Sequence, residues 1–482
     1  MKPDKGGQTV RVLAARLFFW LALSACAWPA GQARASDWVS ERNGPEGQAT
    51  LYAPAAQPLK EWYYFYKTTM RYRPGLAVWA SPALADVADH PLAFIGGHTQ
   101  TLLALDLEDR RVAWLKVTNG EITAAPAVGE VRGRPVVFFT SADRSVYALE
   151  AASGETVWTR ELFPASPTLG HALLTAPVLH AGRLYLTAFV YDKSLARNQQ
   201  RAWLLCLDQA SGDELWRIAA GNGAVNSAVG FEALGRFYLA WSSRKGVVQC
   251  WQAEPGPARL VWKYQMPQEV FGSPVVQTAP APRLYIGSKF GNLACLDALT
   301  GRRLWQRLAG HWIDNSACLG SWEGQTAVFV GSHDYRLYAY DAEDGHLLWS
   351  LALGGEVYTA PVFFRTGNGP RVAAACLDNR LYVAQASTGK LETAFFIGEP
   401  LWDKAPKGET PLGSPAAVVT AADAALVLGS HSGIIGVFPL KQPSQFRDRP
   451  RSFRGLWLSV PAVVLVFLGV VLPVLLRWRG RS

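Results

Sequence analysis

Apolar and polar residues alternate along most of this chain in short runs separated by turns that contain glycine. One apolar run covers Leu284 to Gly287, a second covers Leu293 to Asp297, and a third carries Trp305. Alternation with a period of two, β-branched residues and Thr-Gly or Asp-Gly turns favour antiparallel strands over helices. We therefore predict an all-β chain.

The strands recur as a phrase of about 44 residues. In its clearest copies, a strand ends in an acidic residue, a glycine follows four residues later and then a tryptophan. Examples are Leu293–Asp297 with Gly301 and Trp305, and Tyr338–Asp341 with Gly345 and Trp349. The acid can cap its own turn and the glycine supplies a positive φ. The bulky tryptophan is expected to pack as a wedge between neighbouring units; it recurs at Trp114, Trp158, Trp216, Trp262, Trp305 and Trp349.

The number of units follows from the Ser-Pro-like dipeptides that begin each one. Eight such starts occur, at positions 81, 125, 176, 227, 273, 316, 360 and 414. Only two strands remain after the last start, so residues 61–66 are expected to add its outer strand, with Trp62 as wedge. Closing the ring with both ends of the chain removes exposed sheet edges. We predict an eight-bladed β-propeller of four-stranded antiparallel blades over residues 61–440.

The seventh unit departs from the pattern. Phe395 and Phe396 stand where we expect the tryptophan, and Gln385 replaces the acid.

The first 35 residues have the character of a signal peptide, with basic residues before the apolar stretch Leu17–Trp28. Cleavage after Ala35 would leave residues 36–60 as an N-terminal extension. The sequence Leu23-Ser24-Ala25-Cys26 also resembles a lipobox, which would make Cys26 a lipidated N-terminus. Both processing routes export the propeller.

A second apolar segment covers residues 456–476 and contains no charged residue. As a helix it would be about 31 Å long, enough to span a bilayer. We predict a transmembrane helix there, preceded by a basic juxtamembrane linker at 441–455 and followed by a cytoplasmic tail at 477–482. The propeller would then lie in the periplasm, held at the inner membrane by a single span.

The formal net charge of +9 does not indicate a nucleic-acid partner. Residues 1–35 hold five basic residues and one acidic residue, and residues 441–482 hold eight and one. Residues 36–440 therefore keep 34 basic and 36 acidic residues, a net charge of −2. Basic segments that flank apolar ones suit membrane surfaces. Phosphate binding would instead require a basic face on the propeller itself.

Besides Cys26, the cysteines are Cys206, Cys250, Cys295, Cys318 and Cys376. Cys206 and Cys295 occupy the repeat position that holds Ala104, Ala148 and Ala339 in other units, and Cys250 also fits if its turn is two residues longer. A buried thiol packs as a small apolar group, so we expect free thiols. No Cys-x-x-Cys or metal-ligand spacing occurs, and no metal site is predicted.

Candidate functional residues lie where the inner strands begin. Glu121, Glu269 and Glu356 each stand five residues before the Pro of a strand start, and Glu409 stands six before Pro415. Equivalent positions should point to one mouth of the central channel, where carboxylates could attract a cation or a basic partner segment. Solvated loop carboxylates without a ligand are the alternative.

Three histidines, His98, His333 and His431, also share a register, which turn polarity explains better than a metal site. The longest connections, Glu161–Leu174 and Gly398–Leu412, are candidate recognition surfaces. Trp402 in the second is a plausible anchor for a partner.

The phrase Ala-x-Asp-x-x-(Thr/Ser)-Gly-x-x-x-Trp resembles the repeat of the pyrroloquinoline-quinone (PQQ) type propellers, over residues 61–439. That resemblance implies the propeller fold. The family includes quinoprotein dehydrogenases and propellers that bind no quinone, such as the lipoprotein of the machinery that assembles outer-membrane barrels.

The enzymatic branch implies a vicinal Cys-Cys pair over the quinone, Ca²⁺ held by Glu, Asn and Asp, and an Asp base. This chain has no vicinal cysteines, and no such set can be matched in it. We therefore expect a non-catalytic, membrane-anchored scaffold without cofactor, binding an envelope protein. A PQQ- and Ca²⁺-dependent oxidoreductase is the alternative.

Overall fold

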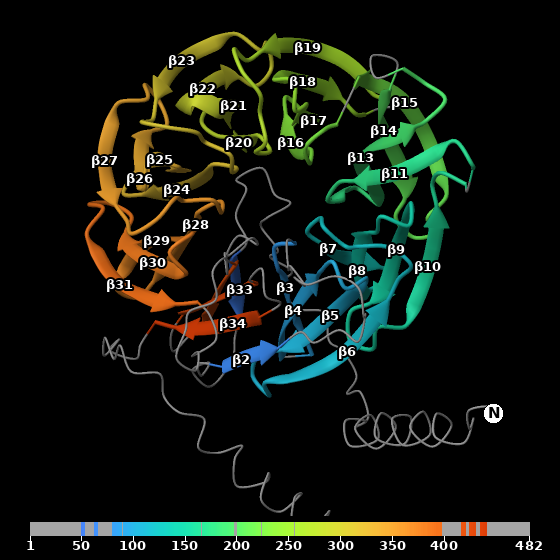
Figure 1. Ribbon diagram of the computed structural model, residues 1–482, viewed down its shortest axis with the longest axis horizontal. Helices are drawn as coiled ribbons and strands as arrows, with labels where there is room; N and C mark the ends of the chain where they lie inside the picture. Colours follow the sequence, from blue (N-terminus) through green and yellow to red (C-terminus); the bar gives the residue numbers. More distant parts are fainter. Residues whose placement is uncertain are drawn as a thin grey trace, which may run out of the picture.

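A ring of β-sheets surrounds a central axis in the computed structural model (Figure 1). It describes residues 50–53, 62–65, 80–88, 90–164, 166–196, 200–222, 224–254, 256–397, 416–420, 424–429 and 434–440. Within them, seven sheets are each built from consecutive strands, and an eighth combines strands from both ends of the chain. The all-β prediction is confirmed.

We number the sheets as blades in chain order. Blade 1 contains β3 (Ala83–Val87), β4 (His90–Gly96), β5 (Thr101–Asp106) and β6 (Arg111–Val117). Blade 2 contains β7 (Ala127–Val131), β8 (Arg134–Thr140), β9 (Ser145–Glu150) and β10 (Thr156–Glu161). Blade 3 contains β11 (Leu169–Leu174), β12 (Val178–His180), β13 (Arg183–Asp192), β14 (Arg201–Asp208) and β15 (Glu214–Asn222). Blade 4 contains β16 (Val229–Ala233), β17 (Arg236–Ser242), β18 (Val247–Gln252) and β19 (Arg259–Gln265).

Blade 5 contains β20 (Val275–Gln277), β21 (Arg283–Gly287), the 3₁₀ turn η2 (Lys289–Gly291), β22 (Asn292–Asp297) and β23 (Arg303–Leu308). Blade 6 contains β24 (Cys318–Trp322), β25 (Gln325–Ser332), β26 (Arg336–Asp341) and β27 (Leu347–Ala352). Blade 7 contains β28 (Val362–Thr366), β29 (Gly369–Cys376), β30 (Arg380–Gln385) and β31 (Leu391–Phe396). Blade 8 contains β32 (Ala416–Thr420), β33 (Ala424–Gly429) and β34 (Ile434–Pro439), with β1 (Thr50–Ala53) and β2 (Trp62–Phe65).

The expected ring closure is present in blade 8. Strand β2 pairs antiparallel with β34, and Trp62 stands opposite Val437. The N-terminal extension adds a strand that the sequence did not predict. This strand, β1, pairs in parallel with β32 at the inner edge of the same sheet. Blade 8 therefore has five strands, two of them from the N-terminal part of the chain.

Each interblade tryptophan stands opposite a small residue on the neighbouring strand of its own blade. Trp305 lies opposite Cys295 and Trp349 lies opposite Ala339, each beside a β-bulge. The ring then covers the glycine of the next blade's turn, since a Cβ on Gly345 would come within 2.7 Å of Trp305. The indole N–H also donates to that blade, as from Trp349 Nε1 to the Ala386 carbonyl oxygen at 2.9 Å. The predicted wedge is confirmed at Trp114, Trp158, Trp262, Trp305 and Trp349.

Trp216 packs against the buried cluster between blades 3 and 4, but it lacks the glycine contact and the hydrogen bond of the other tryptophans. The following blade has a longer turn, in which Gly256 has no atom within 4 Å of an ideal Cβ position. The Trp216 indole N–H is buried without a hydrogen-bond acceptor. Its ring packs against Tyr185 of its own blade, as the Trp305 ring packs against Tyr285.

Our placement of the seventh aromatic position was also wrong. Thr393, opposite Val383, occupies the tryptophan register. Phe395 lies two residues further along β31 and packs against Phe438 of blade 8.

The cores lie between the blades rather than within them. Each of eight clusters of buried side chains joins one pair of neighbouring sheets, including blade 7 with blade 8 and blade 8 with blade 1. Burial of apolar surface between sheets is the main stabilising term for such an arrangement. The clusters are continuous around the ring, so no seam between blades lacks an apolar core.

The ring has two faces. The connections between blades and the hairpins between second and third strands lie on one, which we call the connection face. The turns between first and second, and between third and fourth, strands lie on the other, the turn face. Because β1 runs parallel to β32, the chain enters the ring from the connection face. It leaves after β34 at the turn face, where the Leu440 N–H donates to the Ala424 carbonyl oxygen.

Among the described residues, no helix combines the length and apolar character needed to cross a bilayer. The span predicted over residues 456–476, the linker, the tail, the signal peptide and Cys26 all lie outside the described part of the chain.

Candidate functional site on the connection face

The shared spacing of Glu121, Glu269 and Glu356 has a backbone cause. The carbonyl oxygen of each accepts a hydrogen bond from the hairpin of the blade it enters, donated by the N–H of Ala142, Lys289 and Leu377, respectively. The predicted register is therefore real, and it sets these residues at equivalent places on the connection face. Glu409 and Trp402 lie outside the described residues.

Each of these three glutamates has a basic side chain beside it. Glu121 lies 3.2 Å from His98, Glu269 lies 2.8 Å from Lys289, and Glu356 lies 3.5 Å from His333. The glutamates are 31%, 59% and 36% exposed, so solvent screens these pairs and each contributes little stability. Among the described residues, each of these carboxylates thus has a His or Lys side chain beside it, and the three do not form a ring of isolated carboxylates.

Trp312 occupies the same register in blade 6, where its carbonyl oxygen accepts from the His333 N–H. Its ring lies 5.0 Å from the Lys289 ammonium, and that ammonium also lies 4.6 Å from the centre of the Phe271 ring. The Lys289 charge is thus held between two aromatic faces and the Glu269 carboxylate. Cation–π contacts of this kind fix the ammonium in place.

His333 is the most buried polar group of this cluster, with 8% of its side chain exposed. Its ring stacks near His311, Trp312 and Tyr358. Its Nε2 lies 3.6 Å from Asp314 and its Nδ1 lies 3.5 Å from Glu356. Burial raises the pKa of Asp314, and the charges of His333, Lys289 and His311 oppose that increase. His333 therefore ties together the connections that enter blades 6 and 7.

Three aromatic side chains around this cluster are open to solvent. Phe290, Tyr335 and Tyr358 are 62%, 51% and 40% exposed. Together with Phe271 and Trp312 they form what we call the aromatic surface, which covers the connection face over blades 5 to 7. Exposed aromatic groups held by tied loops are typical of protein-binding surfaces.

The first long connection, Glu161–Leu174, contains strand β11, which pairs with the far half of β13. This pairing extends blade 3 beyond the ring on the connection face, with Leu173, Tyr191 and Leu195 between 39% and 41% exposed. The second long connection, Gly398–Leu412, and His431 lie outside the described residues.

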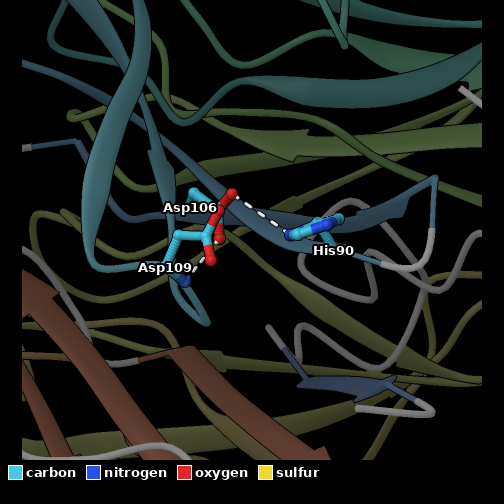
Figure 2. A group of neighbouring side chains, drawn as sticks. All are labelled: His90, Asp106 and Asp109. Atoms are coloured by element: carbon cyan, nitrogen blue, oxygen red, sulfur yellow. Dashed lines mark hydrogen bonds and ion pairs between the residues drawn. The ribbon is translucent and has the colours of Figure 1, made fainter. Parts of the chain in front are cut away.

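Two groups of His and Asp side chains could geometrically hold a cation among the described residues, and both are on the turn face. Figure 2 shows the first, His90, Asp106 and Asp109. The Asp106 carboxylate already accepts the Glu108 and Asp109 N–H groups and lies 3.3 Å from Arg111. The second group, Asp341, Asp344 and His346, has the same turn geometry. Turn capping explains both groups.

The five cysteines of the propeller are buried free thiols, as predicted. They lie on five different strands, β14, β18, β22, β24 and β29, and none adjoins another in sequence. Burial raises the pKa of Cys206 and of Cys295 to about 12, which keeps both protonated at neutral pH. The described thiols therefore do not provide the vicinal pair that the quinoprotein resemblance implies.

Sequence reasoning did not find Lys289, Phe271 or Trp312. The signal for Trp312 was present, since it stands five residues before Ala317, in the register of the glutamates. An aromatic residue at this register was not expected, because the other members known from the sequence are carboxylates.

Comparison with known proteins supports the fold and extends it to a family. A family model described as outer membrane protein assembly factor BamB matches residues 73–193, 200–311 and 289–442. The solved structure of BamB from Moraxella catarrhalis superposes with a TM-score of 0.53 and 16% identity, covering 79% of this chain and 100% of that one. Quinohemoprotein alcohol dehydrogenase from Comamonas testosteroni gives a TM-score of 0.60 and 13% identity, covering 84% and 79%. At these identities the superpositions show the fold alone.

Curated relatives match only in part. The dehydrogenase subunit of a quinone alcohol dehydrogenase from Gluconobacter oxydans is 30% identical over 173 residues, covering 29% of this chain and 21% of that protein. The human β-alanine-activating enzyme is 28% identical over 113 residues, covering 23% and 10%. The chain thus matches about a fifth or less of the length of these relatives. Because the family model spans most of the propeller, the chain belongs to the family described as outer membrane protein assembly factor BamB.

Proposed function

We propose that this protein is a non-catalytic scaffold of the cell envelope, which binds a partner protein through the connection face. The aromatic surface carries this proposal, because Phe290, Tyr335 and Tyr358 are exposed while Trp312 and His333 anchor the loops beneath them. Preordered loops bind a partner with little loss of conformational entropy. Membership of the family suggests a partner from the machinery that assembles outer-membrane proteins.

The proposed anchoring supports the same orientation. The signal peptide over 1–35 would export the propeller, and the span over 456–476 would hold it at the inner membrane. Since β34 leaves the ring at the turn face, a C-terminal anchor would attach on that side. The connection face would then be open to partners in the periplasm.

The experiment is capture of partners from envelope extract by purified protein. A triple variant, Glu121→Gln, Glu269→Gln and Glu356→Gln, removes three carboxylate charges from the connection face but preserves side-chain size. Addition of Glu409→Gln gives the quadruple variant. We expect the triple variant to lose most of the capture at low salt, with a smaller difference at high salt because exposed charges are screened.

The matched control removes three exposed glutamates from the turn face, by Glu155→Gln, Glu323→Gln and Glu343→Gln. It should capture the same partners as wild type. Equal losses from both triple variants, or identical partners for wild type and quadruple variant at both salts, would refute the role of the connection face. A chain ending at residue 455 tests the anchor by fractionation. If that chain remains in the membrane, lipidation at Cys26 is the better explanation.

A quinoprotein oxidoreductase is the second candidate, favoured by the partial match to the quinone alcohol dehydrogenase subunit. The described cysteines are separate buried thiols and include no vicinal pair. Titration of the purified protein with PQQ and Ca²⁺ separates the two. Stoichiometric quinone binding with reduction of an acceptor dye would refute the scaffold function and support the oxidoreductase function.

A further inference from the structure

Strand β1 is the only parallel partner in any sheet of the described residues. Thr50, Leu51, Tyr52 and Ala53 stand opposite Ala417, Val418, Val419 and Thr420. In the other seven sheets, the innermost described strand has a hydrogen-bonded neighbour on its outer side only. Blade 8 alone thus shows how an additional strand is accommodated on the axial side of this ring.

The neighbours of β1 define the place. It lies next to β3 of blade 1 and β28 of blade 7, as well as beside β32. The added strand is therefore bounded on both sides by inner strands of adjoining blades. A segment in this position gains main-chain hydrogen bonds from β32 and is enclosed laterally, which is how an extended peptide is recognised by strand addition.

The chemistry of the resident strand indicates what the place accepts. Its sequence, Thr-Leu-Tyr-Ala, has no charge and contains β-branched and aromatic residues that favour strands. Main-chain pairing supplies affinity without requiring a specific sequence. An uncharged extended segment of similar character could therefore pair in the same way.

Release of β1 need not open the ring. Ring closure depends on β2, which pairs with β34 at the opposite edge of the same sheet. The described members of the buried clusters that join blade 8 to blades 7 and 1 lie on β32, β33, β34 and their neighbours. The inner edge can thus become available while the propeller stays closed.

We propose that the inner edge of β32 is a strand-docking site for an extended, uncharged segment of a partner protein, which pairs in parallel and replaces β1. In this scheme β1 is a tethered competitor that occupies the site until the partner arrives. The proposal goes beyond the scaffold function, because it concerns the axis of the ring rather than the aromatic surface. Each can fail while the other stands.

The test uses the full chain with Leu51→Pro and Tyr52→Pro. Two consecutive prolines remove the N–H that a parallel ladder requires, whichever of the two residues donates it. The probe is a labelled synthetic peptide with the sequence of residues 47–56. We expect the peptide to bind the variant saturably with a Kd of about 100 µM. Binding to wild type should be at least about tenfold weaker, because its tethered β1 competes at an effective concentration in the millimolar range.

Controls separate docking from non-specific binding. A peptide with both prolines and a scrambled peptide should not bind the variant, and a chain with Ser40→Pro and Glu41→Pro should behave as wild type. Equal binding of all peptides, equal binding to wild type, or no binding to a variant with unchanged melting temperature would overturn the proposal.

Hydrogen exchange in the wild-type protein provides a second measurement if the double variant fails to fold. Amides of residues 50–53 should exchange well before those of 62–65, because β1 opens locally while β2 stays paired. Simultaneous exchange of the two segments would contradict a separately accessible site.

Discussion

Five of the interblade tryptophans make three contacts that depend on one another, and Trp349 is an example. It stands opposite a small residue of its own blade, it covers a glycine of the next blade, and it donates a hydrogen bond across the seam. Glycine is required on the far side for two reasons. Gly389 has a φ of +71°, and a Cβ there would come within 2.6 Å of Trp349. The tryptophan and the glycine therefore form one device, spread over two blades.

Trp216 allows the hydrogen bond to be separated from the packing. Trp349 and Trp216 are both partly buried, but only the Trp349 N–H has an acceptor. We expect Trp349→Phe to lower the free energy of unfolding by about 1 kcal/mol more than Trp216→Phe, since it breaks a hydrogen bond and leaves the Ala386 carbonyl oxygen unpaired. Urea midpoints measured with both variants check this. Equal shifts would mean that the bond adds nothing to the packing.

At the residue scale, the repeat made the wedge, the turn acid and the small-residue position predictable. These depend on local sequence and recur in each blade. The partners of Glu121, Glu269 and Glu356 were not predictable, because His98, Lys289 and His333 come from hairpins 20 to 23 residues away in sequence. Which of two adjoining hairpins a glutamate faces depends on side-chain conformation rather than on register.

At the scale of elements, blade 8 connects the two ends of the chain. Strand β2 supplies the outer strand that the eighth repeat unit lacks, and its pairing with β34 closes the ring. An open propeller would expose the outer edge of β34 and weaken the seam with blade 1. The stability of the whole ring therefore depends on a four-residue strand.

Trp62→Ala tests this closure. If Trp62 is the wedge of blade 8, the change should cost about 3–5 kcal/mol, similar to Trp349→Ala, because truncation of a wedge tryptophan removes buried area and leaves a cavity. The comparison of denaturation midpoints uses Trp349→Ala as the reference. A loss below about 1 kcal/mol, as for a surface position, would show that Trp62 is not a wedge.

The elements that sequence reasoning missed are those without a repeat register. Strand β1 has only four residues and pairs with a segment more than 360 positions away, in the parallel sense. No turn or alternation marks such a partner in the sequence. The length of β13, ten residues, was also not predicted from the repeat. Two short strands, β11 and β12, pair with different halves of β13 where other blades have one inner strand.

At the scale of the whole molecule, buried cysteine thiols that stay protonated make the stability of the fold decrease at alkaline pH. Burial raises the pKa of Cys206 and Cys295 to about 12, and also raises the pKa of Cys250 and Cys376. Unfolded thiols ionise near pH 8.5. Above that pH the unfolded state releases protons that the native state retains, so stability is fully present below about pH 8 and decreases as pH rises.

We therefore expect the melting temperature to fall between pH 8 and pH 10.5. The double variant Cys206→Ala and Cys295→Ala should fold, because other blades have an alanine at this repeat position, Ala104 and Ala339. Its melting temperature should fall less over this interval. Thermal scans of both proteins in matched buffers measure the difference. Parallel pH profiles would show that these thiols do not contribute.

The chain ends leave the ring on opposite faces, which has a mechanical consequence. Tension between the N-terminal segment and the residues after Pro439 would pull β1 lengthwise along β32, so that its hydrogen bonds resist together in shear. Without β1, the same tension would act on β2 and β34. Because β2 begins and β34 ends at the turn face, their hydrogen bonds would break one at a time from that end. While β1 stays in place, a pull applied across the molecule is borne along the axis and does not reach the weaker closure of the ring.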